Sequence, residues 1–155
     1  MKKYILSIAL VIASTSFAFG QNVDQLLKKA SKIENVEKVQ IGGFLMGLGK
    51  MFGGVNNMPV AKGVKSMEIL DLSSCDGGTK QNLIKDFKKT RDGNGYETLM
   101  MVREKNDGIR IMVKKEKKYI SEIVFLCMDN NDPAIIKFSG KISEEDINKL
   151  VDQYN

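Results

Sequence analysis

The sequence predicts an α+β fold in which helices cover a single antiparallel sheet of about five strands. Three observations support this class. Apolar residues recur at helical spacing from about residue 22. In the second half of the chain, apolar and polar residues alternate as they do in strands, and turn sequences separate these runs. The chain ends with a sequence that predicts a capped amphipathic helix. With 155 residues, 43% of them hydrophobic and 28% charged, the chain has the size and composition of one globular domain.

Residues 1–20 have the layout of a secretory signal peptide, in which a positive start precedes an uncharged apolar run. Ala18 and Gly20 are the small residues that a signal peptidase requires, so we expect cleavage before Gln21. The apolar run is shorter than the ~20 residues that cross a bilayer, and we expect no transmembrane span after cleavage. An uncleaved membrane anchor or a buried helix is the alternative.

Residues 21–155 should then form a single domain that is exported, periplasmic or secreted. No cysteine lies near the cleavage site, so we do not expect a lipoprotein. Cleavage also removes two lysines and lowers the formal net charge from +5 to +3. That mild excess, in a compartment with little nucleic acid, predicts no nucleic-acid partner.

In the first half, Asn22 is placed to cap a helix that reaches about Ile33, and a short strand is expected at Val36–Ile41. The apolar segment Gly43–Gly54 predicts a second helix, which its own glycines weaken. Residues 53–63 are rich in Gly, Asn and Pro and predict a flexible loop. A further strand is expected at Val64–Leu72.

In the second half, Thr79 is placed to cap a helix that reaches about Arg91, and Ser143 to cap a closing helix. Between them lies a predicted meander of four strands, whose first turn, Asn106–Gly108, is a strong hairpin signal. In the second of these strands, the face that carries Arg110 is expected to be the wetter one. The four strands are expected at Tyr96–Arg103, Ile109–Lys115, Tyr119–Met128 and Ala134–Phe138.

The apolar segment has two interpretations. Its methionines and glycines suit a buried or partly mobile helix that fills irregular space in the core. Alternatively, the segment is a docking surface for a partner protein or a membrane. The candidate contact residues are Phe44, Leu45, Met46, Leu48, Met51 and Phe52.

Cys75 and Cys127 are the only cysteines, and in an oxidising compartment they form a candidate disulfide. The alternative is two unpaired thiols, with Cys127 buried as a small apolar residue. A catalytic cysteine is disfavoured, because a chain with no histidine has no imidazole to hold its thiolate.

The absence of histidine also excludes the common acid–base, nucleophilic and metal-binding chemistries that use imidazole. The acidic turn at Asp129 does not keep the ligand spacing of a calcium loop. Two pairs of carboxylates could in principle serve acid–base catalysis, but each pair has a structural explanation. Glu68 and Asp71 are expected on the solvent-facing side of a strand, and Glu144 and Glu145 in the first turn of a helix, where negative charge is favourable. We predict no catalytic residue, no metal site and no cofactor.

A cluster of lysines joins two predicted strands: Lys114, Lys115, Lys117 and Lys118. With the basic residues of the preceding helix, which are Lys85, Lys88, Lys89 and Arg91, it could form a surface for anionic lipid headgroups or envelope polysaccharide. The plainer interpretation is a solvated face, since lysine at strand ends also discourages aggregation.

The closing pattern Ser-Gly-Lys-Ile-x-x-Glu-Asp-Ile, at residues 139–147, is the most specific part of a resemblance that covers most of the mature chain. The other stretches that carry it are Met67–Leu70, Tyr96–Arg103, Ile109–Val113 and Ile120–Met128. The sequence resembles the exported bacterial family called domain of unknown function 4252. Because that family is uncharacterised, the resemblance implies a small exported α+β domain and no activity.

Taken together, these features predict a non-catalytic binding domain whose partner is an unknown envelope protein or surface. The alternative is a hydrolase-type enzyme that uses carboxylates or a lysine without histidine or metal. An enzyme should gather ionisable groups in a concave pocket, whereas a binder should show an apolar patch or a one-sided basic surface.

Overall fold

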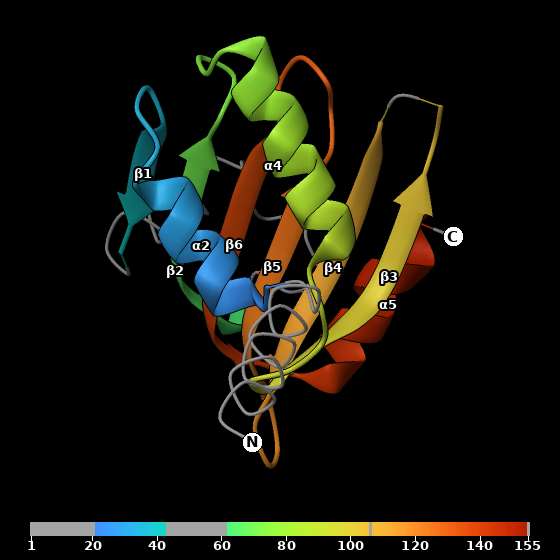
Figure 1. Ribbon diagram of the computed structural model, residues 1–155. Coiled ribbons are helices and arrows are strands. Elements are labelled where there is room, and N and C mark those ends of the chain that lie inside the picture. Colours follow the sequence, from blue (N-terminus) through green and yellow to red (C-terminus); the bar gives the residue numbers. More distant parts are fainter. Residues whose placement is uncertain (1–20, 43–61, 106, 155) are drawn as a thin grey trace, which may run out of the picture.

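A computed structural model describes residues 21–42, 62–105 and 107–154, which form one antiparallel sheet with helices on both faces (Figure 1). Helices α2 and α4 cover one face, and α5 covers the other. The elements of the described residues are, in order, α2 (Val23–Ser31), β1 (Glu37–Ile41), β2 (Val64–Asp71), α4 (Gly77–Lys89), β3 (Tyr96–Arg103), β4 (Gly108–Lys115), β5 (Ile120–Cys127), β6 (Ala134–Ile142) and α5 (Glu144–Tyr154).

The sheet confirms the predicted class and the predicted meander. Its strand order is β1-β2-β6-β5-β4-β3, so the last four strands follow one another as neighbours. Strand β2 pairs with β6, and β1 adds a short edge strand, which brings the described sheet to six strands rather than about five. The expected pairing of the first two meander strands as a hairpin is also confirmed, because β3 and β4 are antiparallel and Arg103 pairs with Gly108.

Two separate apolar clusters hold the helices to the sheet. Side chains alternate along a strand, so β5 sends Val124 and Leu126 toward α2 and α4, and Ile123 and Phe125 toward α5. Strand β5 is apolar on both faces because it lies between β4 and β6 and is covered on both sides. On the first face Leu26 of α2 and Phe87 of α4 are completely buried.

Helix boundaries match the predicted caps in two of three cases. Asn22 caps α2 in a reciprocal pair with Gln25, and the Ser143 hydroxyl accepts a hydrogen bond of 3.2 Å from the amide of Asp146. The prediction for Thr79 was wrong: α4 is capped by Asp76, whose carboxylate accepts from the Thr79 amide at 2.9 Å and from its hydroxyl. These bonds stabilise the charged carboxylate and lower the pKa of Asp76.

The expected helix at Gly43–Gly54 lies outside the described residues, as does the part of the expected loop at residues 53–61. The candidate docking residues Phe44, Leu45, Met46, Leu48, Met51 and Phe52 lie there too, so both interpretations of that segment remain predictions. Within the described part of the chain, none of the helices is long and apolar enough to cross a membrane.

Candidate functional site

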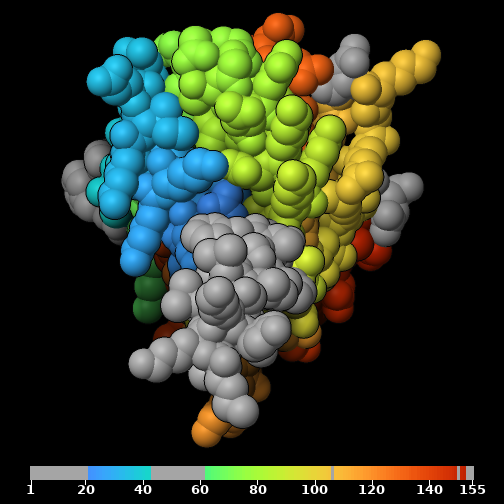
Figure 2. Space-filling model, viewed as in Figure 1, coloured from blue at the N-terminus to red at the C-terminus, as the bar shows by residue number. Residues whose placement is uncertain are grey.

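A shallow groove of about 560 Å³ runs between the C-terminal end of α4 and strand β3, where Figure 2 shows the surface hollowed. A smaller hollow of about 100 Å³ shares Lys88 and Arg103 with it. We call the larger feature the basic groove. Its lining residues are Lys88, Lys89, Thr90, Arg91, Asp92, Thr98, Met101, Arg103 and Arg110.

The sequence places these side chains through ordinary helix and turn geometry. Phe87 is buried against the sheet, so the next two residues, Lys88 and Lys89, are exposed at the end of α4. The chain then turns through Gly93, Asn94 and Gly95, which all have positive φ, and enters β3. This tight turn keeps the basic end of α4 beside β3.

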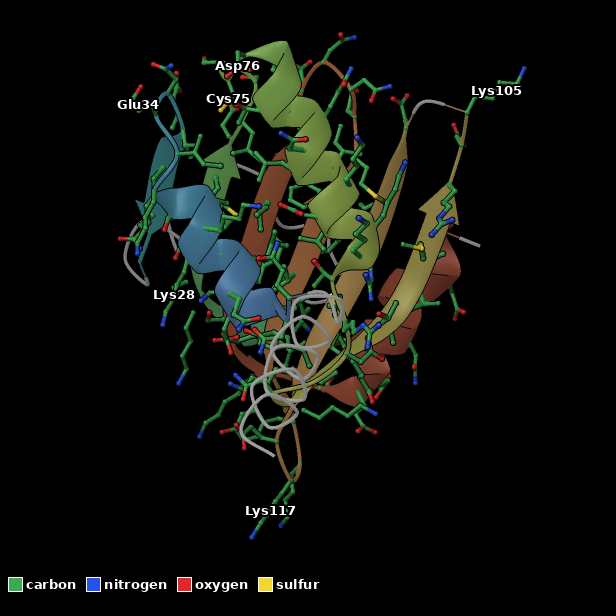
Figure 3. All side chains as sticks on the ribbon, in the orientation of Figure 1. Lys28, Glu34, Cys75, Asp76, Lys105 and Lys117 are labelled. Atoms are coloured by element: carbon green, nitrogen blue, oxygen red, sulfur yellow. The ribbon has the colours of Figure 1, made fainter. Side chains whose placement is uncertain are left out.

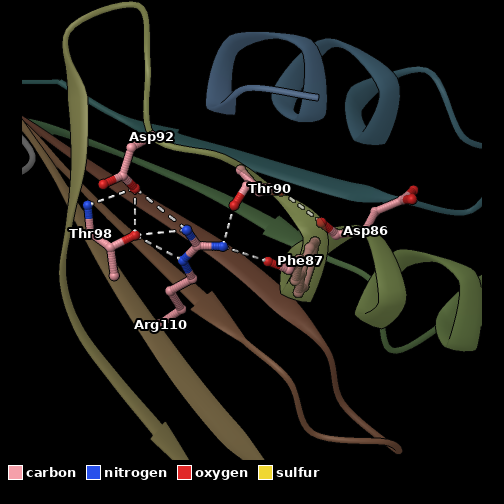
Figure 4. A network of polar contacts seen from close by, with 6 residues as sticks. All are labelled: Asp86, Phe87, Thr90, Asp92, Thr98 and Arg110. Atoms are coloured by element: carbon pink, nitrogen blue, oxygen red, sulfur yellow. Dashed lines mark hydrogen bonds and ion pairs between the residues drawn. The ribbon is translucent and has the colours of Figure 1, made fainter. Parts of the chain in front are cut away.

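Arg110 forms the floor of the basic groove. Its residue is only 7% exposed, and its Nη1 donates to the backbone carbonyls of Phe87, at 3.1 Å, and of Thr90. Carbonyls at a helix C-terminus lack partners within the helix, so Arg110 caps α4 from the sheet (Figure 4). Its Nε and Nη2 donate to the hydroxyl of Thr98 at 3.1 and 2.7 Å.

Asp92 is the acidic residue of the groove lining, and one of its oxygens completes this network. Its Oδ1 accepts from the amide of Thr98 at 3.0 Å and from the Thr98 hydroxyl at 2.7 Å. The same oxygen lies 3.5 Å from Nη2 of Arg110. The Asp92 side chain is nevertheless 55% exposed, so its carboxylate is open to solvent while Arg110 beside it is buried.

The electrostatic balance of the basic groove is strongly positive. Burial lowers the pKa of Arg110, the charge of Asp92 raises it, and Arg103 lowers it further. An arginine remains protonated at neutral pH despite such a shift, because its ordinary pKa lies far above neutral pH. The lining therefore has five arginine and lysine side chains and one carboxylate, which suits it to hold an anion.

The sequence prediction missed Arg110 as a site residue. The face of β4 that carries Arg110 and Met112 was expected to be the wetter one, but both residues are buried because α4 and its following loop cover them. One signal in the sequence could have indicated that Arg110 is buried: Arg110 and Met112 are two positions apart in a strand, so they lie on the same face of the sheet. A guanidinium in such a position needs several acceptors, which here are helix carbonyls.

The predicted lysine cluster lies elsewhere, and none of its members lines the basic groove. Lys114 and Lys115 end strand β4, and Lys117 and Lys118 lie in the turn that leads to β5. Figure 3 shows Lys117 at the tip of this turn, away from α4. Lys114 lies over the ring of Tyr96, 5.4 Å from its centroid, and Lys115 pairs with Glu97 at 3.1 Å. Of the four hairpin lysines, which are Lys114, Lys115, Lys117 and Lys118, two thus have partners within the fold.

Cys75 and Cys127 are free thiols in this structure, and Cys75 is buried whereas Cys127 is partly buried. Cys75 follows β2 and packs with α2 and α4, whereas Cys127 packs on the opposite face with the cluster around α5. Burial raises the pKa of both thiols, which keeps them protonated and poorly nucleophilic near neutral pH.

The carboxylates considered for acid–base chemistry are not brought together as pairs. Glu68 and Asp71 are three residues apart in β2, so they point to opposite faces of the sheet. Glu68 interacts with Gln40 at 3.3 Å, and Asp71 accepts from the amide of Ser73 at 2.9 Å. Glu145, on α5, pairs with Lys149 of the same helix at 2.9 Å.

Comparison with known proteins identifies the family. No curated protein and no solved structure matches the chain. The family model described as "Domain of unknown function (DUF4252)" matches residues 28–150, which include α4, the whole meander and every residue of the basic groove. The chain therefore belongs to the DUF4252 family, an uncharacterised domain family, as its strand and closing-helix motifs predicted.

Proposed function

We propose that this protein is an exported, non-catalytic domain that binds an acidic polysaccharide of the cell envelope through its basic groove. The observation that carries the proposal is the charge of the groove, where five cationic side chains converge with a single carboxylate. These cations come from different elements: Lys88 lies on α4, Arg103 lies on β3, and the buried Arg110 of β4 forms the floor.

The shape of the surface favours a polymer over a bilayer. A groove admits an extended chain, and the arginine side chains can form paired hydrogen bonds with its carboxylates. A flat bilayer would meet protruding parts of the fold first, such as the turn that carries Lys117 (Figure 3). Met101 adds an apolar contact in the groove for the carbon skeleton of a sugar.

The same side chains favour binding over turnover. Acid–base catalysis requires a group whose proton can leave and return near neutral pH, and a guanidinium such as Arg110 cannot supply it. Asp92, the carboxylate of the groove, already accepts hydrogen bonds from the amide and hydroxyl of Thr98.

Export is supported by the signal-like residues 1–20 and by the contacts that Gln21 and Asn22 make with the rest of the domain. The carbonyl of Gln21 accepts a hydrogen bond from the amide of Arg91 at 3.0 Å, and Asn22 caps α2. Cleavage before Gln21 would leave all of these contacts intact. Expression in a Gram-negative host should therefore give a periplasmic protein whose mass corresponds to residues 21–155. A cytoplasmic protein of full-length mass would contradict export.

Binding is tested with polygalacturonate as the acidic polymer and with dextran as the neutral one, by calorimetry at about 0.1 M salt. The mature protein should bind polygalacturonate and not dextran. The double variant Lys88→Glu with Arg103→Glu should weaken this binding at least about thirtyfold. Loss of the two cations alone removes about 2 kcal/mol, at about 1 kcal/mol for each cation near a dense anionic surface, and the two added carboxylates repel the polymer.

The matched control is Lys117→Glu with Lys118→Glu, which makes the same charge change on the hairpin. This control should weaken binding only slightly, because screening limits its reach to about 10 Å at 0.1 M salt. Equal losses in the two double variants would contradict a groove-specific site. Binding to vesicles that contain phosphatidylglycerol, without binding to polygalacturonate, would assign the surface to membranes and overturn the proposal.

A further inference from the structure

Three groups in the basic groove surround one carboxylate oxygen, Oδ1 of Asp92. The amide of Thr98, at 3.0 Å, and its hydroxyl, at 2.7 Å, donate hydrogen bonds to this oxygen, and Nη2 of Arg110 forms an ion pair with it at 3.5 Å (Figure 4). We call this set of donors the carboxylate cradle. The chain's own carboxylate shows that the cradle has the geometry and charge to hold one.

Thr98 and Arg110 are fixed independently of Asp92. Both lie in paired strands, and Thr98 is opposite Met112 in the register of β3 and β4. The guanidinium of Arg110 is held by the carbonyls of Phe87 and Thr90. The cradle should therefore keep its form when its carboxylate leaves.

The side chain of Asp92, in contrast, can be displaced from the cradle. It is 55% exposed, and its Oδ1 is too far from Nη2 of Arg110 for a normal hydrogen bond. It lies directly before Gly93, whose φ of 146° belongs to a region that only glycine adopts easily. Four other cations line the groove around Arg110, so a second anion that approaches meets a net positive field.

We infer that the carboxylate cradle of Thr98 and Arg110 is a subsite for a ligand carboxylate, which the chain's own Asp92 occupies until the ligand replaces it. The inference rests on the proposed function for its ligand class, and it narrows that class to polymers of acidic sugars that carry carboxylates. Asp92 then acts as an internal competitor that lowers affinity for small anions and favours ligands with many carboxylates.

The cradle is tested without any polymer, by rescue of the variant Asp92→Ala with acetate. Removal of the side chain should lower the Tm, and acetate should raise the Tm of the variant more than chloride does at the same ionic strength. Wild type and the control Asp132→Ala, which changes an exposed carboxylate on another turn, should show no difference between the two salts. An equal effect of acetate and chloride on Asp92→Ala would overturn the inference, as would an equal effect of phosphate and acetate.

A second measurement applies to the wild-type protein and does not depend on the folding of a variant. The amide proton of Thr98 should shift in nuclear magnetic resonance spectra during titration with trigalacturonate, because its acceptor changes. Polymer binding without a shift at Thr98 would overturn exchange at the cradle while leaving the basic groove as the binding surface. Acetate rescue without polymer binding would support the cradle and contradict the proposed function.

Discussion

The basic groove and the hairpin lysines are both rich in positive charge, but the fold gives them different chemistry. The groove gathers cations from α4, β3 and β4 around a hollow, and its deepest member, Arg110, is fixed by backbone carbonyls. The hairpin concentrates four lysines in five residues, yet they lie at the end of β4 and on the turn after it, where Lys117 protrudes from the fold (Figure 3). Density of charge along the chain thus does not indicate convergence of charge in space.

The two regions also differ in how much their charged side chains contribute to the stability of the fold. Arg110 satisfies carbonyls that α4 cannot satisfy for itself, so its charge is part of the fold. Lys115 is exposed and pairs with Glu97 at the surface, where solvent and salt weaken such pairs. We therefore expect substitutions in the two regions to separate clearly in stability.

The largest effect is expected for Arg110→Met. This change leaves the carbonyls of Phe87 and Thr90 without their buried donor, and it should lower the free energy of unfolding by about 2–3 kcal/mol. Lys117→Met, the matched change on the hairpin, should stay within about 0.5 kcal/mol of wild type. Urea unfolding curves measure both, and equal stabilities would contradict the structural role of Arg110.

A smaller effect is expected for Asp92→Asn, which keeps an oxygen for the donors of Thr98 but removes the negative charge of the groove. Polygalacturonate should bind roughly fivefold more tightly, as expected for about 1 kcal/mol per charge, and the gain should disappear at high salt. Asp132→Asn provides the control outside the groove. Calorimetric titrations that give the same affinity for wild type and Asp92→Asn would show that the groove does not contact the polymer.

The smallest effect is expected in the pH dependence of the hairpin pair. Glu97 raises the pKa of Lys115 in the folded state above the ordinary 10.5, through a hydrogen bond first and its charge second. The stability that this pair contributes is complete below pH 10.5 and is lost as the pH rises through the folded-state pKa of Lys115. The Tm difference between wild type and Glu97→Gln should therefore shrink above pH 10.5, and a constant difference would contradict the pairing.

The family and much of the fold could be predicted from the sequence. Alternation and turn residues defined the meander from Tyr96 to Phe138, and Asn22 and Ser143 marked the helix starts, because these signals depend on neighbours within a few residues. The cap of α4 was predicted at Thr79 rather than Asp76, since two glycines at the start of a helix weaken the local signal.

By itself the sequence determined which segments pair or coil, where charge is dense, and that imidazole chemistry is excluded, since composition and short-range periodicity carry all three. The tertiary structure alone decided that Arg110 is buried under α4, that Asp92 and Thr98 meet it, and that the hairpin lysines stand apart. The physical reason is range: Arg110 lies 20 residues from Thr90 and 23 from Phe87, and only the docking of α4 on β4 brings those carbonyls to its guanidinium.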